Sequence, residues 1–210
     1  MPLPPERLVL IADRCTEVER WPRFARALEG GVRWVLLRDR EAEAEDFAAT
    51  VPELANFLRS HRESVYLSVS GDLEVAQQLQ AGLHIGNQDV PLEEARAKLG
   101  GKWLIGFSSH NYQEVEYAYG KANYVFFGPV FRTLSKPGHP GVGVHALQEV
   151  TQAFKELPIF ALGGVLPERV PACLQAGAYG IAVHSGILDA PDPAERAAQY
   201  LYILNRTFPE

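Results

Sequence analysis

The stretch 159–186 reads IFALGGVLPERVPACLQAGAYGIAVHSG and holds two short apolar segments on either side of a helical pattern. The apolar segments, Ile159–Leu162 and Gly180–Val183, are typical of buried strands. Between them, Pro167–Ala176 carries apolar residues three and four positions apart, and it starts with a proline, whose missing N–H costs nothing there. Strands joined by a helical crossover lie parallel, so this stretch predicts one strand–helix–strand unit of a parallel sheet.

The same alternation extends outward from this unit through the whole chain. Six more apolar segments are predicted as strands: Leu8–Ala12, Trp34–Leu37, Val65–Val69, Gly82–Ile85, Trp103–Phe107 and Tyr124–Phe127. Five more segments have helical periodicity: Glu41–Ser60, Pro91–Leu99, Tyr112–Tyr119, Leu147–Glu156 and Pro193–Leu204. Eight parallel strands with right-handed crossovers close into a barrel. We therefore predict an α/β fold, a single-domain (β/α)8 TIM barrel over residues 1–210, with a doubly wound open sheet as the alternative.

The amino-acid composition limits the kinds of molecule that the protein is expected to bind. The net charge is −6 over 210 residues, which offers no basic field for a nucleic acid. No apolar run approaches the roughly 18 residues that span a bilayer, and the first residues lack a signal-peptide pattern. Cys15 and Cys173 are far apart, as expected of reduced cysteines. These features predict a cytoplasmic protein that uses neither nucleic acid nor membrane; a homodimer is left open.

Active sites of such barrels form at the carboxyl ends of the strands. Gly163 and Gly164 follow the seventh predicted strand and leave backbone N–H groups uncovered, which suits an oxyanion. Ser185 follows the eighth strand and adds a hydroxyl. The alternative for the glycine pair is a simple tight turn. Because phosphate sites recur after strands seven and eight of barrels, we predict phosphate binding here.

Two further groups suit a negatively charged ligand. The loop 128–143 after the sixth strand contains Lys136 and four glycines, and it could fold over an anion; an unstructured surface loop is the alternative. Arg38 ends the second strand and could bind phosphate or carboxylate through two donors. An ion pair with Asp13 or Asp39 is the alternative for Arg38.

Histidines are the candidates for proton transfer near neutral pH. His184, His139 and His110 follow predicted strands, whereas His84 lies in an apolar run and is equally explained as a packed core residue. Asp89 is the candidate metal ligand. It is a poor site alone, because a Mg²⁺ ion on a diphosphate usually takes one or two carboxylates.

The chain resembles the thiamine phosphate synthase/TenI superfamily over nearly its whole length. The resemblance rests on these motifs: Leu37–Arg40, Gly82–Asp89, Ile105–His110, Asn123–Phe131 continuing to Thr133–Lys136, Ala161–Val165 and Ala182–Ile187. It implies a barrel that handles the phosphorylated thiazole half of thiamin. Two activities belong to this family: a synthase that joins a pyrimidine diphosphate to thiazole phosphate with Mg²⁺, and a tautomerase that moves a proton on a carboxylated thiazole phosphate. Some members are described as regulators.

The chain departs from both patterns. Where the resemblance implies Asn-Asp-Asp in the synthase, the chain reads Val69-Ser70-Gly71, so one Mg²⁺ ligand is missing; Leu36 also replaces a glutamine. Asp89 matches the other ligand, and Arg38, Ser108 and Lys136 match positions that contact diphosphate. Pro129 stands where the tautomerase has a histidine.

On this basis we predict a TenI-like protein that binds thiazole phosphate, with tautomerase-type proton transfer placed first. A synthase that uses pyrimidine diphosphate and Mg²⁺ comes second, and an inactive ligand-binding homologue third. The predicted catalytic residues are His184, His139 and Lys136. The predicted substrate- and phosphate-binding residues are Arg38, Arg40, Ser108, Thr133, Ser135, Lys136, Gly163, Gly164, His184 and Ser185, and the metal ligand is Asp89. No cofactor is predicted apart from Mg²⁺ under the synthase hypothesis.

Overall fold

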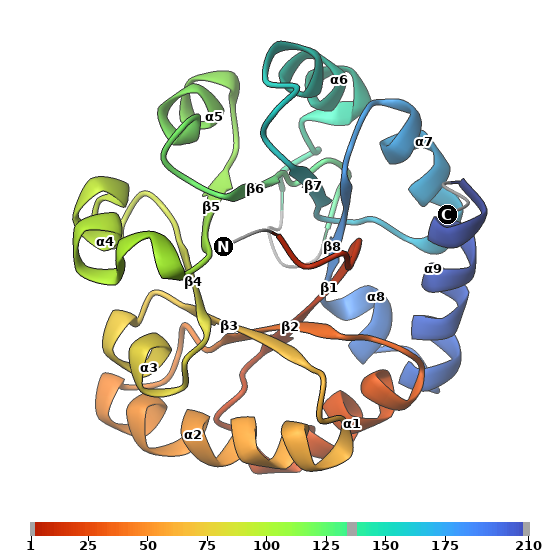
Figure 1. Ribbon diagram of the computed structural model, residues 1–210. Coiled ribbons are helices and arrows are strands. Elements are labelled where there is room, and N and C mark those ends of the chain that lie inside the picture. The colour runs from red at the N-terminus through yellow and green to blue at the C-terminus, as the bar shows by residue number, and fades with distance from the viewer. Residues whose placement is uncertain (1–2, 134–137, 208–210) are drawn as a thin grey trace.

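The computed structural model describes residues 3–133 and 138–207 (Figure 1). Its strands are β1 (Leu8–Asp13), β2 (Trp34–Arg38), β3 (Tyr66–Ser70), β4 (Gly82–Ile85), β5 (Ile105–Ser109), β6 (Tyr124–Phe127), β7 (Ile159–Leu162) and β8 (Gly180–Val183). Each pairs in parallel with the next, and β8 pairs with β1, so the sheet is a closed barrel. The predicted (β/α)8 barrel is confirmed, and the open sheet is excluded.

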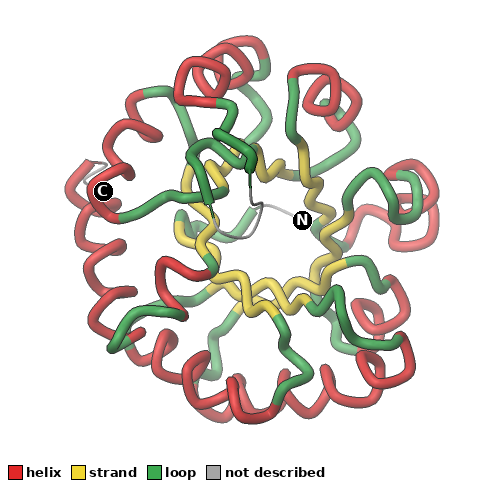
Figure 2. Tube along the Cα trace, turned by 180° about the vertical axis from the view of Figure 1, so that it is seen from behind, coloured by secondary structure: helices red, strands yellow, loops and turns green. Residues whose placement is uncertain are grey.

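Helices surround the barrel on the outside (Figure 2). They are α1 (Trp21–Glu29), α2 (Ala44–His61), α3 (Leu73–Gln78), α4 (Leu92–Leu99), α5 (Tyr112–Ala118), α6 (Gly143–Ala153), α7 (Val170–Gln175), α8 (Ser185–Leu188) and α9 (Pro193–Thr207). Three short 3-10 turns, η1 (Val18–Arg20), η2 (Gly100–Lys102) and η3 (Pro167–Arg169), accompany them.

Side chains of each strand alternate between two apolar layers, as the two-residue period of a strand requires. In β1, Val9 and Ile11 point into the barrel, whereas Leu8 and Leu10 face the helices. The interior cluster contains Val9, Ile11, Trp34, Leu36, Tyr124, Phe126, Phe160 and Ala182. Its rings meet edge to face, with 4.9 Å between the ring centroids of Trp34 and Tyr124. The barrel interior is thus a packed core.

The segment before β1 covers the amino end of the barrel. Figure 1 shows it crossing the middle of the strand ring. Leu3 packs against the interior cluster. The interior cluster is therefore covered at the amino end by this segment.

Several predicted boundaries shift. β3 lies at Tyr66–Ser70 instead of 65–69. β5 lies at Ile105–Ser109 instead of 103–107, because Trp103 directly follows η2 and is apolar without belonging to the ladder. The predicted helix 167–176 divides into η3 and α7. Pro171 lacks the N–H that an α-helix would direct to the carbonyl of Pro167, so the first turn is a 3-10 turn.

Candidate active site

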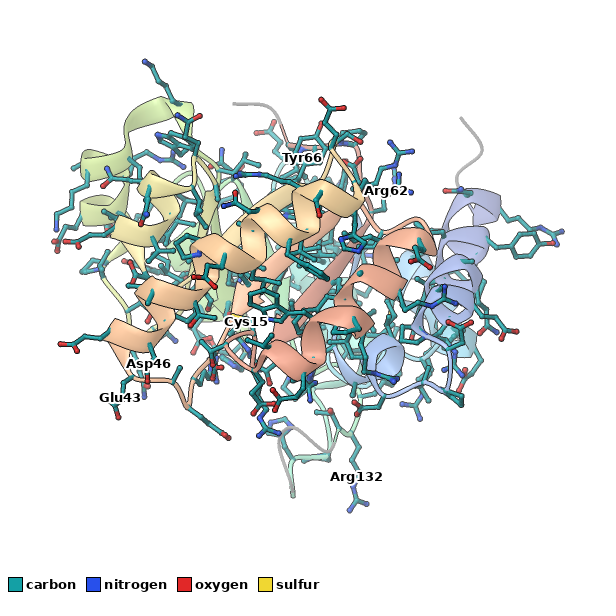
Figure 3. All side chains as sticks on the ribbon, turned by 90° about the horizontal axis from the view of Figure 1, so that it is seen from below. Cys15, Glu43, Asp46, Arg62, Tyr66 and Arg132 are labelled. Atoms are coloured by element: carbon teal, nitrogen blue, oxygen red, sulfur yellow. The ribbon has the colours of Figure 1, made fainter. Side chains whose placement is uncertain are left out.

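A pocket opens at the carboxyl ends of the strands. In Figure 3, Arg132 and Glu43 lie towards one end of the barrel, opposite Tyr66 at the start of β3. The pocket has about 910 Å³ of empty space, including its open mouth. Among the predicted site residues it is lined by Arg38, Arg40, Ser108, Thr133, Gly163, Gly164, His184 and Ser185. The structure thus brings eight predicted residues together from five strand ends.

Gly163 and Gly164 let the loop after β6 approach the end of β7. Both have positive φ, +89° and +64°, and a Cβ atom on Gly164 would lie 2.5 Å from the carbonyl oxygen of Arg132. The loop is bonded to this strand end, since the N–H of Val130 donates to Leu162 O at 2.7 Å and that of Phe131 donates to Gly163 O at 3.0 Å. The glycine pair is therefore a tight turn that also lines the pocket, which combines the two alternatives raised by the sequence.

The beginning of α8 lies beside this turn. The N–H groups of Ile187 and Leu188 donate to the carbonyl of His184 at 3.1 and 3.0 Å. The preceding N–H groups, those of Ser185 and Gly186, have no acceptor inside the helix, as is general for the first residues of a helix. Both residues line the pocket, so this corner offers backbone donors to an anion.

Arg38 joins the pocket to Asp13 at the end of β1. The two residues are paired in the ladder, and Arg38 Nε donates to Asp13 Oδ1 at 2.6 Å. Burial alone would raise the pKa of the Asp13 carboxyl, but the hydrogen bond and charge of Arg38, together with His184 and Arg40, hold it below 3.8. The predicted alternative, an ion pair with Asp13, is thus present. In the described residues nothing accepts a hydrogen bond from the Nη atoms of Arg38, which leaves them available to a ligand.

His184 faces the same corner. Its Nε2 lies 3.9 Å from Asp13 Oδ2, and neither ring nitrogen has a hydrogen-bond partner in residues 3–133 or 138–207. Burial lowers the pKa of His184 below 6.5, and the negative charge of Asp13 offsets this only in part. An imidazole that is neutral at pH 7 can accept a proton, so His184 has the chemistry of a general base.

Ser108 ends in the pocket, but its hydroxyl is also held from below. His84 Nε2 lies 2.9 Å from Ser108 Oγ, and His84 Nδ1 lies 3.2 Å from the hydroxyl of Tyr124. The sequence left His84 open as a packed core residue; it is buried, and it also contacts a site residue. Spacing alone could not reveal this contact, because β4, β5 and β6 become neighbours only in the barrel.

One predicted residue, His139, lies outside the pocket, and two others are not among the described residues. His139 is exposed, and its Nδ1 accepts a hydrogen bond from the N–H of Gly141 at 3.0 Å. It is not among the described residues that line the pocket. Ser135 and Lys136 lie outside the described residues, so their predicted roles stay predictions.

Asp89 does not form a magnesium site with a second carboxylate. It is exposed, and its Oδ2 accepts a hydrogen bond from the N–H of Gly86 at 2.7 Å. A Cβ atom on Gly71 would lie 3.3 Å from Asp89 Oδ1, so position 71 faces Asp89 but bears no ligand. Nowhere in the described part of the chain do three His, Cys, Asp or Glu side chains gather in a way that could hold a metal. The described residues do not fit a two-carboxylate site.

A closed (β/α)8 barrel with a polar pocket at the carboxyl ends of its strands defines the class of barrel enzymes. Residues 8–187 match the family model described as thiamine monophosphate synthase. The chain belongs to the thiamine phosphate synthase/TenI superfamily.

Individual relatives agree with this assignment. The chain is 34% identical over 184 residues to a thiamine-phosphate synthase of Bacteroides fragilis, covering 84% of this chain and 89% of that protein. It is 38% identical over 184 residues to a putative thiamine-phosphate synthase of Geobacter sulfurreducens, covering 85% and 84% of the two chains. A solved thiamine phosphate pyrophosphorylase from Pyrococcus furiosus superposes with a TM-score of 0.84 at 26% identity, covering 97% and 98%. These relatives carry the name of the activity that the sequence analysis placed second.

No helix within residues 3–133 and 138–207 has both the length and the apolar character needed to cross a membrane.

Proposed function

We propose that the protein is a thiamine-phosphate synthase, which joins a pyrimidine diphosphate to thiazole phosphate and releases diphosphate. The observation that carries this proposal is that one pocket contains two sets of anion-binding groups. Arg38, Arg40 and Ser108 come from the ends of β2 and β5, whereas Gly164 and Ser185 come from the ends of β7 and β8. Two phosphorylated substrates need two such sets, and the names of the relatives support the same reaction.

The groups divide into two roles. The N–H groups near Gly164 and Ser185 bind the phosphate of the thiazole, as backbone donors at the ends of barrel strands seven and eight commonly do. Arg38, Arg40 and the hydroxyl of Ser108 bind the diphosphate. As a new bond forms between the pyrimidine half and the thiazole, the bond between the pyrimidine half and the diphosphate breaks. The electron pair of the broken bond leaves with the diphosphate. Positive charge and hydrogen-bond donors at that point stabilise the leaving group.

The missing carboxylate at position 71 bears on the metal. Mg²⁺ would supply charge neutralisation for a bound diphosphate, and Asp89 is the described carboxylate at the matching position. Because Asp89 lacks a partner carboxylate, we assign no step to the ion. Charge neutralisation falls instead on Arg38 and Arg40, which line the pocket directly.

The test is a coupled assay with both half-molecules, in which thiamin phosphate is measured with and without Mg²⁺. We expect turnover by the wild type and a loss of about a hundredfold or more in Arg38→Gln, because removing one donor to a developing charge has effects of this size. Arg33→Gln is the matched control, since Arg33 is exposed at the amino end of β2 and should leave the rate unchanged. Absence of thiamin phosphate from the wild type under both conditions would refute the proposal.

A second candidate, tautomerase-type proton transfer, is favoured by one observation. The ring nitrogens of His184 are buried, without a hydrogen-bond partner in the described residues, and His184 lines the pocket. Pro129 stands where the tautomerase resemblance implies a histidine, so His184 would be the base. The assay is solvent-deuterium incorporation into a carboxylated thiazole phosphate. Incorporation that His184→Gln abolishes, without thiamin phosphate formation by the wild type, would place this activity first.

A further inference from the structure

Five polar side chains form a line inside the barrel that ends at the pocket. Trp34 Nε1 donates to Ser68 Oγ at 3.0 Å, and His84 lies between Tyr124 and Ser108 at 3.2 and 2.9 Å. Trp34, Ser68, His84 and Tyr124 are each at most 2% exposed. Buried polar groups this deep in an aromatic core are costly unless they are satisfied, so the direction of each hydrogen bond can be worked out.

The direction is set at the far end by the indole of Trp34, which can only donate. Ser68 Oγ accepts from it, and the hydroxyl hydrogen of Ser68 then has Tyr124 as the described acceptor. Burial raises the pKa of Tyr124, so its phenol keeps its proton and can donate it to His84 Nδ1, which lies 3.2 Å away. The hydroxyl of Tyr124 is thereby left to donate to His84 Nδ1.

This order fixes the state of His84. With Nδ1 accepting, a neutral imidazole carries its proton on Nε2, which donates to Ser108 Oγ. Burial, followed by the charges of Arg38 and Arg40, lowers the pKa of His84 to about 3, so the ring is neutral near pH 7. Ser108 therefore accepts from below, and its own hydrogen is free to point into the pocket.

We propose that His84 is a positioning residue that holds the hydroxyl of Ser108 as a hydrogen-bond donor to a diphosphate oxygen of the substrate. The assignment of diphosphate to this end of the pocket rests on the proposed function. Without this arrangement, a serine hydroxyl could turn its lone pairs toward the anion and weaken its binding.

The surroundings of His84 show how closely the ring is held. Its ring lies 4.3 Å from that of Phe126 and 5.5 Å from that of Tyr124, measured between centroids. Gly106 of β5 makes room for it, since a Cβ atom there would lie 2.5 Å from His84 Nδ1. An apolar ring would pack in this space with no polar group to satisfy. The imidazole instead links the buried line to Ser108.

The first test uses the wild-type protein and therefore does not depend on the folding of a variant. Nitrogen-15 NMR of the histidine side chains reports which ring nitrogen carries the proton. We expect His84 to show a protonated Nε2 and an unprotonated Nδ1, unchanged from about pH 8 to about pH 5, across the range where an ordinary histidine titrates. A proton on Nδ1, or titration within this range, would overturn the proposal.

The second test is a double-mutant cycle with inorganic pyrophosphate as the probe and its Kd from calorimetry as the readout. Ser108→Ala should raise Kd about tenfold, the usual effect of losing a hydrogen bond to a charged group. Tyr124→Phe removes the hydroxyl that fixes the tautomer of His84. It should raise Kd about threefold when Ser108 is present but not at all in the Ser108→Ala background. Tyr117→Phe, which removes a hydroxyl bonded to Glu93 outside the barrel, is the control and should change nothing.

Additive effects in the cycle, or no measurable binding of pyrophosphate by the wild type, would overturn the positioning role. The outcome is separable from that of the proposed reaction. A coupled cycle in a protein that makes no thiamin phosphate would refute the synthase and leave His84 as a positioning residue. If the protein makes thiamin phosphate but the effects in the cycle are additive, the synthase proposal stands and the positioning role of His84 is refuted.

Discussion

Position 71 shows how a single residue changes the chemistry of the pocket rim. Gly71 has a φ of +76° and faces Asp89, so Gly71→Asp would place two carboxylates side by side. We expect this variant to be less stable by about 1–3 kcal/mol without metal, because backbone strain and like-charge repulsion add. Mg²⁺ should restore much of the loss, which thermal unfolding with Mg²⁺ and with a chelator would measure.

The control for this prediction is Gly120→Asp. Gly120 has nearly the same φ, +75°, but a Cβ atom there meets nothing within 4 Å. This variant should lose stability through strain alone and should gain nothing from Mg²⁺. An equal response of the two variants to Mg²⁺ would show that position 71 and Asp89 do not act together.

The ion pair between Asp13 and Arg38 leads to a prediction about pH. The pKa of Asp13 is lowered in the folded protein, so its contribution to stability is present above its ordinary value of 3.8 and is lost as the pH falls through the lowered value. Because the pair is mostly buried, Asp13→Asn should lower the free energy of unfolding by about 1–3 kcal/mol at pH 7. This difference from the wild type should shrink below about pH 4. Urea unfolding at a series of pH values measures both.

Asp192→Asn serves as its comparison. Asp192 pairs with Arg26 at the surface and accepts a hydrogen bond from the N–H of Ala194, which an asparagine oxygen can still accept. Its replacement should change stability little, as for exposed ion pairs generally. If Asp192→Asn costs as much as Asp13→Asn, the partial burial of the Asp13 pair has no special effect.

Residue types and their places after strands were enough to predict most of the pocket. Arg38, Ser108, Gly164 and Ser185 were found because each lies at or just after the carboxyl end of an apolar strand. The ion pair of Arg38 was predicted only as an alternative, with Asp13 or Asp39 as its partner, and the structure selects Asp13. The line from Trp34 to Ser108 could not be predicted, because it joins side chains of strands distant in sequence. The sequence could not place His139, because its position in a glycine-containing loop does not indicate whether its side chain reaches the pocket; in the structure it is exposed and its predicted role stays a prediction.

At the scale of elements, the packing of α1 against α9 depends on a glycine. A Cβ atom on Gly30 would overlap the backbone carbonyl of Ala194 at the start of α9. Gly30→Ala should lower the free energy of unfolding by about 1–3 kcal/mol, as overpacked sites do. Gly101→Ala, where a Cβ atom meets nothing within 4 Å, should stay within about 0.5 kcal/mol of the wild type. Chemical denaturation of both variants decides this, and equal stabilities would contradict the predicted overlap.

The strands were predictable because buried parallel strands are short apolar runs with clear ends; β4, β6, β7 and β8 have the predicted bounds. The helices were less predictable than the strands. α3 and α8 are only six and four residues long, too short to show a helical period. α6 begins at Gly143, four residues before the predicted Leu147, because a glycine with a φ of +84° gives no signal of a helix start.

At the scale of the whole molecule, the two cysteines report on the barrel as one unit. Cys15 follows β1 and Cys173 lies in α7; both are free and fully buried, and burial raises the pKa of each thiol to about 12. Neither should react with a thiol reagent in the native state. Both should be labelled at one common rate, that of global unfolding, if the barrel opens cooperatively.

Labelling followed by mass spectrometry of the two peptides measures these rates separately. Faster labelling of Cys173 would show instead that α7 detaches while the strands stay paired. Cys173→Ala would then leave the slow rate of Cys15 unchanged.

The aromatic interior and Leu3 fill the barrel beneath the pocket, so in the described residues the pocket opens at the carboxyl ends of the strands. If two molecules bind one above the other in such a pocket, the deeper one cannot leave past the shallower one. Whichever partner occupies the deeper position must arrive first and depart last, and the shallower partner must follow it in and precede it out. Binding and release would then be ordered. The product that leaves last should inhibit competitively with the substrate that binds first and not with the second substrate.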